Sequence, residues 1–282
     1  MKTKEELIDQ LLDLAFAEDI GDGDHTTLST IPADAVGKSK LLIKEEGILS
    51  GVDIAIRTLN KLDPSIKVEV LIQDGTKVKP GDIAFIAEGP VRSLLIAERT
   101  LLNIMQRMSG VATMTRKYQD ELQGLHTKVL DTRKTTPGMR LLEKQGVKDG
   151  GGENHRIGLF DMILIKDNHI DFAGGLEKAV QRAVDYCREK GLNLKIEVEA
   201  RTLDDVRKLA EMEGVDRIMF DNMTPATTRE AVKIVDGRKE TESSGGITIE
   251  NLREYGETGV DFISVGALTH SVKGLDMSFK SC

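Results

Sequence analysis

The chain has 282 residues, of which 39% are hydrophobic and 30% are charged, and it contains no tryptophan. This length fits an α/β barrel, alone or joined to one small domain, and the composition is that of a globular protein rather than a disordered or membrane-spanning one. The formal net charge of -8 argues against nucleic acid as the main partner, because duplex binding needs clustered Lys and Arg over a broad face. Any anion site must therefore be local.

The first residues, MKTKEELIDQLLDLAFAEDIGDGD, predict an amphipathic helix and not a targeting segment. Leu7, Leu11 and Leu14 recur at helical spacing, and acidic residues interrupt the apolar run that a signal peptide needs. No apolar stretch approaches transmembrane length. The two cysteines, Cys187 and Cys282, lack the spacing of a disulfide framework or a zinc knuckle. We therefore expect plain thiols, a cytoplasmic location and no membrane partner.

Residues 38–89 contain short strand-like runs separated by turn residues: KSKLLIKEEGILSG, IKVEVLIQDGTKV and DIAFIAEG. VDIAIRTLNKL, between them, has helical spacing, so this part predicts an α+β unit on an antiparallel sheet. The next stretch, SLLIAERTLLNIMQRMSGVATMTRKYQDEL, predicts a long helix that connects two domains. Arg99 and Arg107 would lie about two turns apart on it, where solvent exposure is the ordinary expectation.

From Thr127 onward, short apolar runs alternate with predicted helices, which include LEKAVQRAVDYCREK and PATTREAVKIV. The runs are KVLDT, MILIK, KIEVE, RIMFD, the stretch into ESSGG, and FISVG. Such alternation calls for parallel strands with right-handed crossovers, and about six units favour a closed TIM-like barrel over an open sheet. The predicted division is an N-terminal domain over 1–115, a barrel carrying the site over 116–269, and a C-terminal segment, 270–282, that returns to the first domain.

Polar residues follow each predicted barrel strand, and parallel strands end at one mouth, where sites form. They are Asp131, Arg133 and Lys134; Lys166, Asn168 and His169; Glu199; Asp221 and Asn222; Ser243, Ser244, Gly245 and Gly246; and Gly266. A single charged residue after a strand is usually a solvated loop residue. Charged residues at the same end of several strands indicate a site.

The charges of this ring change along the chain. Early strands bring cations, to which the glycine-rich stretch adds His155 and Arg156, and Glu199 and Asp221 bring carboxylates. The later segments SSGG and VGALTHS offer backbone N–H groups for a phosphate. The ring thus suggests a phosphorylated substrate with Mg²⁺, since Mg²⁺ prefers oxygen ligands, beside a second substrate with several negative charges. Zinc is not favoured, because the histidines lack helical metal-site spacing and no cysteine lies near.

Several long motifs in order resemble the quinolinate phosphoribosyltransferase family, the carboxylating nicotinate-nucleotide pyrophosphorylases of NAD biosynthesis. They are ERTLLNIMQRMSGVAT, DTRKTTPGMRLLEKQGVKDGGGENHRIGLFDMILIKDNHI, IEVEA, MFDNM, SSGGIT and ISVGALTHS. The resemblance runs from AEDIGDGDHTT to VGALTHS. It implies an N-terminal α/β sandwich, a seven-stranded TIM-like α/β barrel, and a homodimer, or a higher oligomer, in which each site borrows from its neighbour.

The resemblance also implies an activity and a role for each site residue. The enzyme would be a pentosyltransferase that joins the phosphoribosyl group of phosphoribosyl pyrophosphate to the ring nitrogen of quinolinate, releasing CO2 and pyrophosphate and giving nicotinate mononucleotide, with Mg²⁺ and no organic cofactor. Quinolinate would bind to Arg133, His155, Arg156, Lys166, His169 and, from the other subunit, Arg99. Phosphoribosyl pyrophosphate would meet the catalytic residues Lys134, Glu199 and Asp221, the last two also holding Mg²⁺ directly or through water. The 5′-phosphate would lie against Ser244, Gly245, Gly246, Gly266 and His270.

Two alternatives stay open at this point. One is a related phosphoribosyltransferase with another acceptor, such as nicotinate, although the full set of cations argues against a monoacid. The other is a non-catalytic sensor of phosphate ligands, against which Glu199 and Asp221 speak. The sequence also leaves open how these two carboxylates divide their work, whether the protein assists decarboxylation, and which histidine touches quinolinate.

Overall fold

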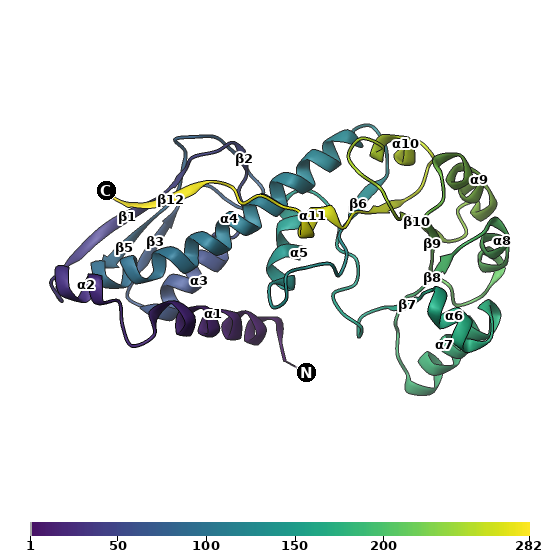
Figure 1. Ribbon diagram of the computed structural model, residues 1–282, viewed down its shortest axis with the longest axis horizontal. Coiled ribbons are helices and arrows are strands. Elements are labelled where there is room, and N and C mark those ends of the chain that lie inside the picture. Colours follow the sequence, from purple (N-terminus) through teal and green to yellow (C-terminus); the bar gives the residue numbers. More distant parts are fainter. Residues whose placement is uncertain (1) are drawn as a thin grey trace. The chain divides into compact units, whose positions relative to one another are not determined.

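The computed structural model describes residues 2–282, which form two compact units (Figure 1). Of the described residues, the first unit comprises 2–116, 135–151 and 268–282, and the second comprises 117–134 and 152–267. Mixed α/β structure is present in both. In the described residues no helix is long and apolar enough to cross a membrane.

The first unit is built on an antiparallel sheet with the strand order β12-β1-β5-β3. Its strands are β1 (Val36–Ile43), β3 (Lys67–Val70), β5 (Ile83–Pro90) and β12 (Met277–Ser281), and a two-stranded ladder joins β2 (Gly47–Ile48) to β4 (Lys77–Val78). Strand residues such as Leu41 and Phe85 share a core with Leu59 and Leu101 of two helices, α3 (Val52–Leu62) and α4 (Val91–Glu121). The antiparallel sheet predicted from residues 38–89 is confirmed.

Further helices of this unit pack on the helical layer. α1 (Lys4–Ile20) begins with a capping box between Thr3 and Glu6, and its residues Ile8 and Leu12 share a second cluster with Met108 of α4. The short helix α2 (His25–Thr30) follows and has Asp24 as its N-cap. The predicted N-terminal helix is thus present, but its buried residues are Ile8 and Leu12, whereas Leu7 and Leu14 of the predicted apolar side are exposed.

Residues 135–151 belong to the first unit, although we predicted them within the barrel at 116–269. Their helix α5 (Arg140–Asp149) lies close to α4 because Gly146 and Gly150 leave room for its backbone. A Cβ on Gly146 would come 2.8 Å from the carbonyl oxygen of Met108. The buried Glu143 also pairs with Arg107 at 2.8 Å, so the predicted solvent exposure of Arg107 is wrong.

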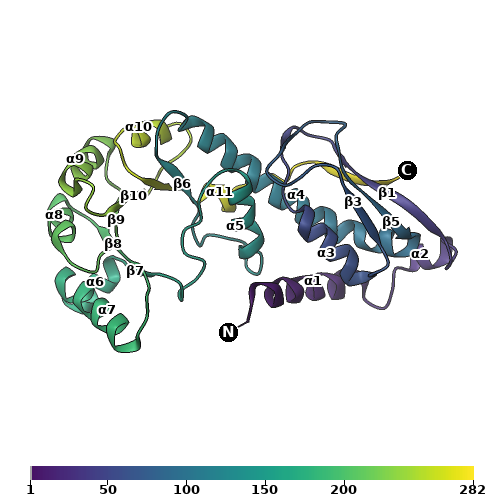
Figure 2. The ribbon, with the colours of Figure 1, turned by 180° about the vertical axis from the view of Figure 1, so that it is seen from behind.

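The second unit is a parallel sheet with the strand order β6-β11-β10-β9-β8-β7. The strands are β6 (Lys128–Leu130), β7 (Ile163–Ile165), β8 (Ile196–Ala200), β9 (Arg217–Asp221), β10 (Glu240–Ser244) and β11 (Phe262–Ser264). Helices cover its convex side, as Figure 2 shows from behind: α6 (Asp167–Ala173), α7 (Leu176–Lys190), α8 (Leu203–Glu211), α9 (Pro225–Val235) and α10 (Leu252–Gly256). The last short helix, α11 (Ala267–His270), begins where this unit ends.

The described parallel sheet has six strands, whereas the resemblance implied a seven-stranded barrel. Glu153 makes an isolated parallel bridge with Leu130, so it continues the sheet beyond β6. Three glycines precede Glu153 and no apolar run follows it, which gives this segment little to bury as a longer strand. The parallel, helix-covered sheet is as predicted.

Candidate active site

The bridge at Glu153 brings the glycine-rich stretch to the end of β6. The N–H of Glu153 donates to the carbonyl of Val129 at 2.8 Å, and the N–H of Asp131 donates to the carbonyl of Glu153 at 3.2 Å. Two residues further on, the N–H of His155 donates to the buried carboxylate of Asp131 at 2.9 Å. These bonds place His155 and Arg156 beside the segment that carries Arg133 and Lys134.

Arg156 and Arg133 lie close enough to influence each other. Burial lowers the pKa of the Arg156 guanidinium, and the charge of Arg133 lowers this pKa further. One N–H of Arg156 donates to the carbonyl of Met162 at 3.3 Å. Asp161 closes the intervening loop by accepting the N–H groups of Ile157 and Gly158 at 2.7 and 2.8 Å. A partly buried guanidinium, Arg156, and an exposed one, Arg133, thus lie near each other, and such a pair favours an anion with more than one negative charge.

Both predicted histidines accept a backbone N–H through Nδ1. His155 accepts from Arg156 at 2.7 Å and His169 accepts from Lys166 at 2.9 Å. Their surroundings differ, because His155 is only 8% exposed and His169 is exposed on α6. Arg156 and His169 line the same pocket beside β7.

The end of β7 is joined to the end of β8 through Glu199. The Nζ of Lys166 lies 3.2 Å from Oε1 of Glu199, and the N–H of Asp167 donates to Oε2 at 3.1 Å. Glu199 is buried, while the Lys166 side chain is 46% exposed. The carboxylate therefore holds the lysine at the mouth and leaves its ammonium accessible to a ligand.

The ends of β9 and β10 are fitted tightly to each other. Asn222 has a left-handed backbone, with φ of 51°, and its N–H donates to the carbonyl of Ser244 at 2.8 Å. Its side-chain amide donates to Asp221 at 3.0 Å. Only glycine fits at Gly245, because a Cβ there would run into the Asn222 side chain. Gly245 and Gly246 both have positive φ, 99° and 64°, a turn in which N–H groups can be presented to an anion.

The sheet face that carries Glu199 also bears charged side chains further from the strand ends, toward the middle of the strands. Side chains alternate along a strand, so Glu197 shares a face with Glu199, and there it meets Arg217 of β9 and Glu242 of β10. Burial raises the pKa of Glu197, and burial together with the Glu197 carboxylate raises the pKa of Glu242 to about 8. Burial alone would lower the pKa of Arg217, but these two carboxylates raise it.

Our sequence reasoning missed this buried set. The signal was present as alternating charges inside apolar runs, in KIEVE, RIMFD and TESSG. Such alternation ordinarily indicates a strand with one solvated face. In a curved parallel sheet the second face lines the interior, so the alternation marks internal charges.

A ready-made metal cluster does not occur at the predicted Mg²⁺ residues. Over residues 2–282, the one group of three metal-ligating side chains is His155, Glu197 and Glu242, whose ligand atoms lie within 4.8 Å of one another. Glu199 and Asp221 are carboxylates at neighbouring regions of the mouth, and both already accept hydrogen bonds. They fit a Mg²⁺ ion that takes most of its ligands from substrate phosphate and water.

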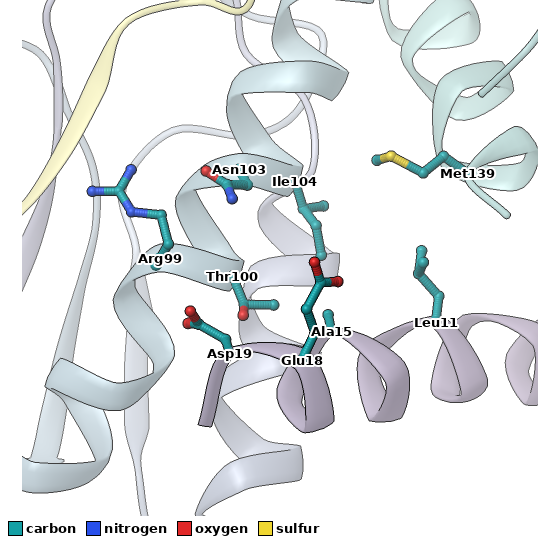
Figure 3. A pocket seen from close by; sticks show the side chains of 9 residues that line it. All are labelled: Leu11, Ala15, Glu18, Asp19, Arg99, Thr100, Asn103, Ile104 and Met139. Atoms are coloured by element: carbon teal, nitrogen blue, oxygen red, sulfur yellow. The ribbon is translucent and has the colours of Figure 1, made fainter. Parts of the chain in front are cut away.

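Two predicted site residues belong to the first unit. Arg99 is exposed on α4 and lines a pocket with the acidic Glu18 and Asp19 of α1 (Figure 3). Within the described chain its side chain has neither an ion-pair nor a hydrogen-bond partner. His270 ends α11, where its Nδ1 lies 2.6 Å from the hydroxyl of Ser271. Gly266 directly precedes α11 and is the last residue of the predicted ring that belongs to the second unit.

The second unit therefore gathers most of the predicted ring on its strand ends and on the Glu153 bridge. Direct contacts join Lys166 to Glu199 and Asp221 to its neighbour Asn222, and Arg133 affects the charge of Arg156. The backbone N–H of Lys134 donates to the hydroxyl of Thr132 at 3.0 Å. The arrangement can bind a polyanion beside a phosphorylated ligand.

Comparison with known proteins agrees with this architecture. Residues 24–109 match the family model "Quinolinate phosphoribosyl transferase, N-terminal domain" and residues 111–280 match its C-terminal domain. A protein of Nicotiana glauca named quinolinate phosphoribosyltransferase [decarboxylating] 2, mitochondrial, is 44% identical over 96% of this chain and 81% of its own length. The probable nicotinate-nucleotide pyrophosphorylase [carboxylating] of Bacillus subtilis is 43% identical over 95% and 91%.

Solved structures give the same result. NadC from Streptococcus pyogenes superposes with a TM-score of 0.92 at 37% identity, covering 99% of this chain and 98% of its own. The nicotinate-nucleotide pyrophosphorylase from Francisella tularensis has a TM-score of 0.90 at 40% identity, with coverage of 100% and 98%. The chain belongs to the quinolinate phosphoribosyl transferase family.

Proposed function

We propose that this chain transfers the phosphoribosyl group of phosphoribosyl pyrophosphate to the ring nitrogen of quinolinate and releases CO2 and pyrophosphate, giving nicotinate mononucleotide. The observation that carries the proposal is the pair of adjacent guanidiniums, Arg133 and Arg156, at the mouth of the parallel sheet. Relatives at 43–45% identity are named for this reaction. A phosphoribosyl acceptor with two carboxylates matches two guanidiniums better than a monoacid does.

Quinolinate would bind to the cations of the second unit and to one residue of a neighbouring subunit. Arg133 and Arg156 can each bind a carboxylate in a bidentate fork, and Lys166 adds an ammonium that Glu199 holds in position. His169 completes this wall, with His155 alongside. Arg99, which has no partner of its own in the described chain, would reach the site of the second subunit of a homodimer or a higher oligomer.

Phosphoribosyl pyrophosphate would bind across the ends of β8, β9 and β10. Lys134 would meet the pyrophosphate, and Mg²⁺ held through its oxygens by Glu199 and Asp221 would neutralise the leaving charge. The tight turn at Ser244, Gly245 and Gly246 would receive the 5′-phosphate. Gly266 and His270 would complete that end of the site.

The chemistry follows from charge. As the bond between C1 of the ribose and pyrophosphate breaks, C1 becomes cationic, and a fixed carboxylate such as Asp221 stabilises it. The lone pair of the pyridine nitrogen then forms the new bond to C1. The resulting quaternary nitrogen accepts the electron pair left when the adjacent carboxylate departs as CO2, and that carbon then takes a proton. No organic cofactor is required for these steps.

The location of the protein stays a prediction. The sequence favours the cytoplasm, while several plant relatives are named as mitochondrial or chloroplastic.

The function is tested by incubating the purified chain with phosphoribosyl pyrophosphate, Mg²⁺ and quinolinate labelled in the carboxylate next to the ring nitrogen. We expect labelled CO2 and nicotinate mononucleotide in equal amounts, and no reaction after chelation of Mg²⁺. Nicotinate replaces quinolinate in the control. Equal turnover of nicotinate, or binding of both ligands without product, would contradict the proposal.

A further inference from the structure

The two site histidines have the same ring tautomer but different neighbours. In each, Nδ1 accepts a backbone N–H, from Arg156 onto His155 and from Lys166 onto His169. An accepting Nδ1 carries no proton, so the proton of the neutral ring is on Nε2. The two residues therefore differ in what surrounds the ring, since His155 is buried while His169 is exposed and lines a pocket with Arg156.

The Nε2 of His155 faces a buried charged network and not the mouth of the site. It lies 2.9 Å from Oε2 of Glu197 and 3.5 Å from Oε2 of Glu242, as close polar contacts rather than hydrogen bonds, and both glutamates are fully buried. Glu242 in turn lies 3.3 Å from Nη1 of Arg217, whose guanidinium stacks on the Phe262 ring at 4.3 Å. Because Arg217 already supplies the positive charge that the carboxylates need, this set is better suited to hold a histidine than a metal ion.

His155 is fixed on its main-chain side as well. Its own N–H donates to the buried Asp131 at 2.9 Å. Its ring accepts the N–H of Arg156, the residue that begins the loop closed by Asp161. Rotation of this ring would release the Arg156 backbone, and the Arg156 guanidinium would move with it.

We propose that Glu197 and Glu242 are positioning residues that act through the ring of His155 on Arg156, whereas His169 is the histidine whose Nε2–H faces the substrate. This inference rests on the proposed function, because it takes Arg156 as a ligand of a quinolinate carboxylate. It divides between two residues the roles that the sequence left open.

Which ring nitrogen carries the proton can be measured on the full-length wild-type protein. Nitrogen NMR of ¹⁵N-histidine-labelled protein, assigned with His155→Asn and His169→Asn, is recorded with and without quinolinate. We expect neutral His155 with its proton on Nε2 in both spectra, and a change of the His169 ring signals on addition of quinolinate. A His155 that carries its proton on Nδ1, or whose ring signals change more than those of His169, would overturn the inference.

Kinetics separate positioning from general destabilisation. Glu197→Leu removes the carboxylate that contacts His155 and should raise the KM for quinolinate about tenfold, the scale of one buried polar contact, with the KM for phosphoribosyl pyrophosphate unchanged. Glu197→Gln keeps an oxygen and should stay near wild type. Glu240→Gln is the matched control, since Glu240 pairs with the same Arg217 but makes no contact with His155. Equal changes of both KM values in Glu197→Leu would argue against positioning.

The two proposals fail in different ways. Absence of quinolinate turnover in the wild type would refute the proposed function and with it the substrate role of His169. The spectra of the wild type without ligand would still decide the tautomer of His155.

Discussion

Adjacent guanidiniums at the mouth of the second unit make a site that is unfavourable until an anion arrives. Arg133 lowers the pKa of Arg156, so part of the binding energy of a dicarboxylate comes from relieving this repulsion. The carboxylate of Asp221 has a different task, since it would act on charge that appears during the reaction. Substitutions should therefore separate binding from turnover.

We expect Arg133→Ala and Lys166→Ala to raise the KM for quinolinate about 10- to 100-fold, because each removes a charged hydrogen bond. Asp221→Ala should instead lower kcat about 100-fold, by loss of electrostatic stabilisation in the transition state. Initial-rate kinetics with each substrate varied would distinguish the two classes. Arg188→Ala, on the exposed side of α7, is the control, and wild-type kinetics in all of the site variants would refute the assignment.

The buried Glu242 predicts how stability depends on pH. Its pKa is about 8 in the folded protein and near its ordinary value of 4.5 in the unfolded chain. Between these values the folded state keeps a proton that the unfolded state releases, so the free energy of unfolding falls as pH rises from about 4.5 to 8. Glu242→Gln has no proton to lose and should flatten this slope. Urea unfolding at pH 6 and pH 8 measures it, and an unchanged slope in the variant would contradict the raised pKa.

Site residues at strand ends could be predicted because they follow apolar runs in the sequence. Glu199 and Asp221 are the last charged residues of KIEVE and RIMFD. Glu197 lies in the middle of KIEVE and Arg217 begins RIMFD, but neither could be interpreted, because an inward charge and a solvated charge give the same alternation. Only the curvature of the sheet, which depends on residues far apart in the chain, distinguishes the two.

At the scale of elements, the sequence predicted helices with strong local signals most closely. The run LEKAVQRAVDYCREK coincides with α7 (Leu176–Lys190), and PATTREAVKIV coincides with α9 (Pro225–Val235). Thr224 caps α9 and Pro225 begins it, which are local features that a sequence displays.

Elements that depend on distant partners were harder to predict. α5 belongs with α4 because glycines allow the two backbones to approach, and nothing within 135–151 alone indicates which partner it packs on. The single-residue bridge of Glu153 likewise depends on Leu130. Short elements such as α2 and α6 gave no apolar period, so we did not predict them.

The approach of α5 to α4 is testable at Gly150. This residue has an ordinary right-handed backbone, with φ of −73°, so alanine brings no backbone strain. Its Cβ, however, would run into the carbonyl oxygen of Ala112. We expect Gly150→Ala to lower the free energy of unfolding by about 1–3 kcal/mol. Glu189→Ala, at an exposed position of α7, should change it by less than about 0.5 kcal/mol, and equal stability of the two variants in urea would refute the close packing.

At the scale of the whole molecule, a shared site predicts complementation between two inactive variants. Arg99→Ala and Arg133→Ala homodimers would each lack a substrate ligand in both sites. A mixed dimer would hold one intact site, so random reassembly should restore about a quarter of wild-type activity, because half of the dimers are mixed. Activity is measured before and after mixing under conditions that allow subunit exchange. No recovery, although exchange is verified by mass, would show that Arg99 does not act across subunits.

The pairing of β12 with β1 has a consequence for synthesis. The register runs from Ser39 with Ser281 to Ile43 with Met277, so one edge of the first sheet stays open until residues 277–281 leave the ribosome. All strands of the second unit are made before then. The unit that begins the chain is therefore the last to be completed, and the nascent protein carries an unpaired strand edge, which is prone to wrong pairing, throughout the translation of the parallel sheet.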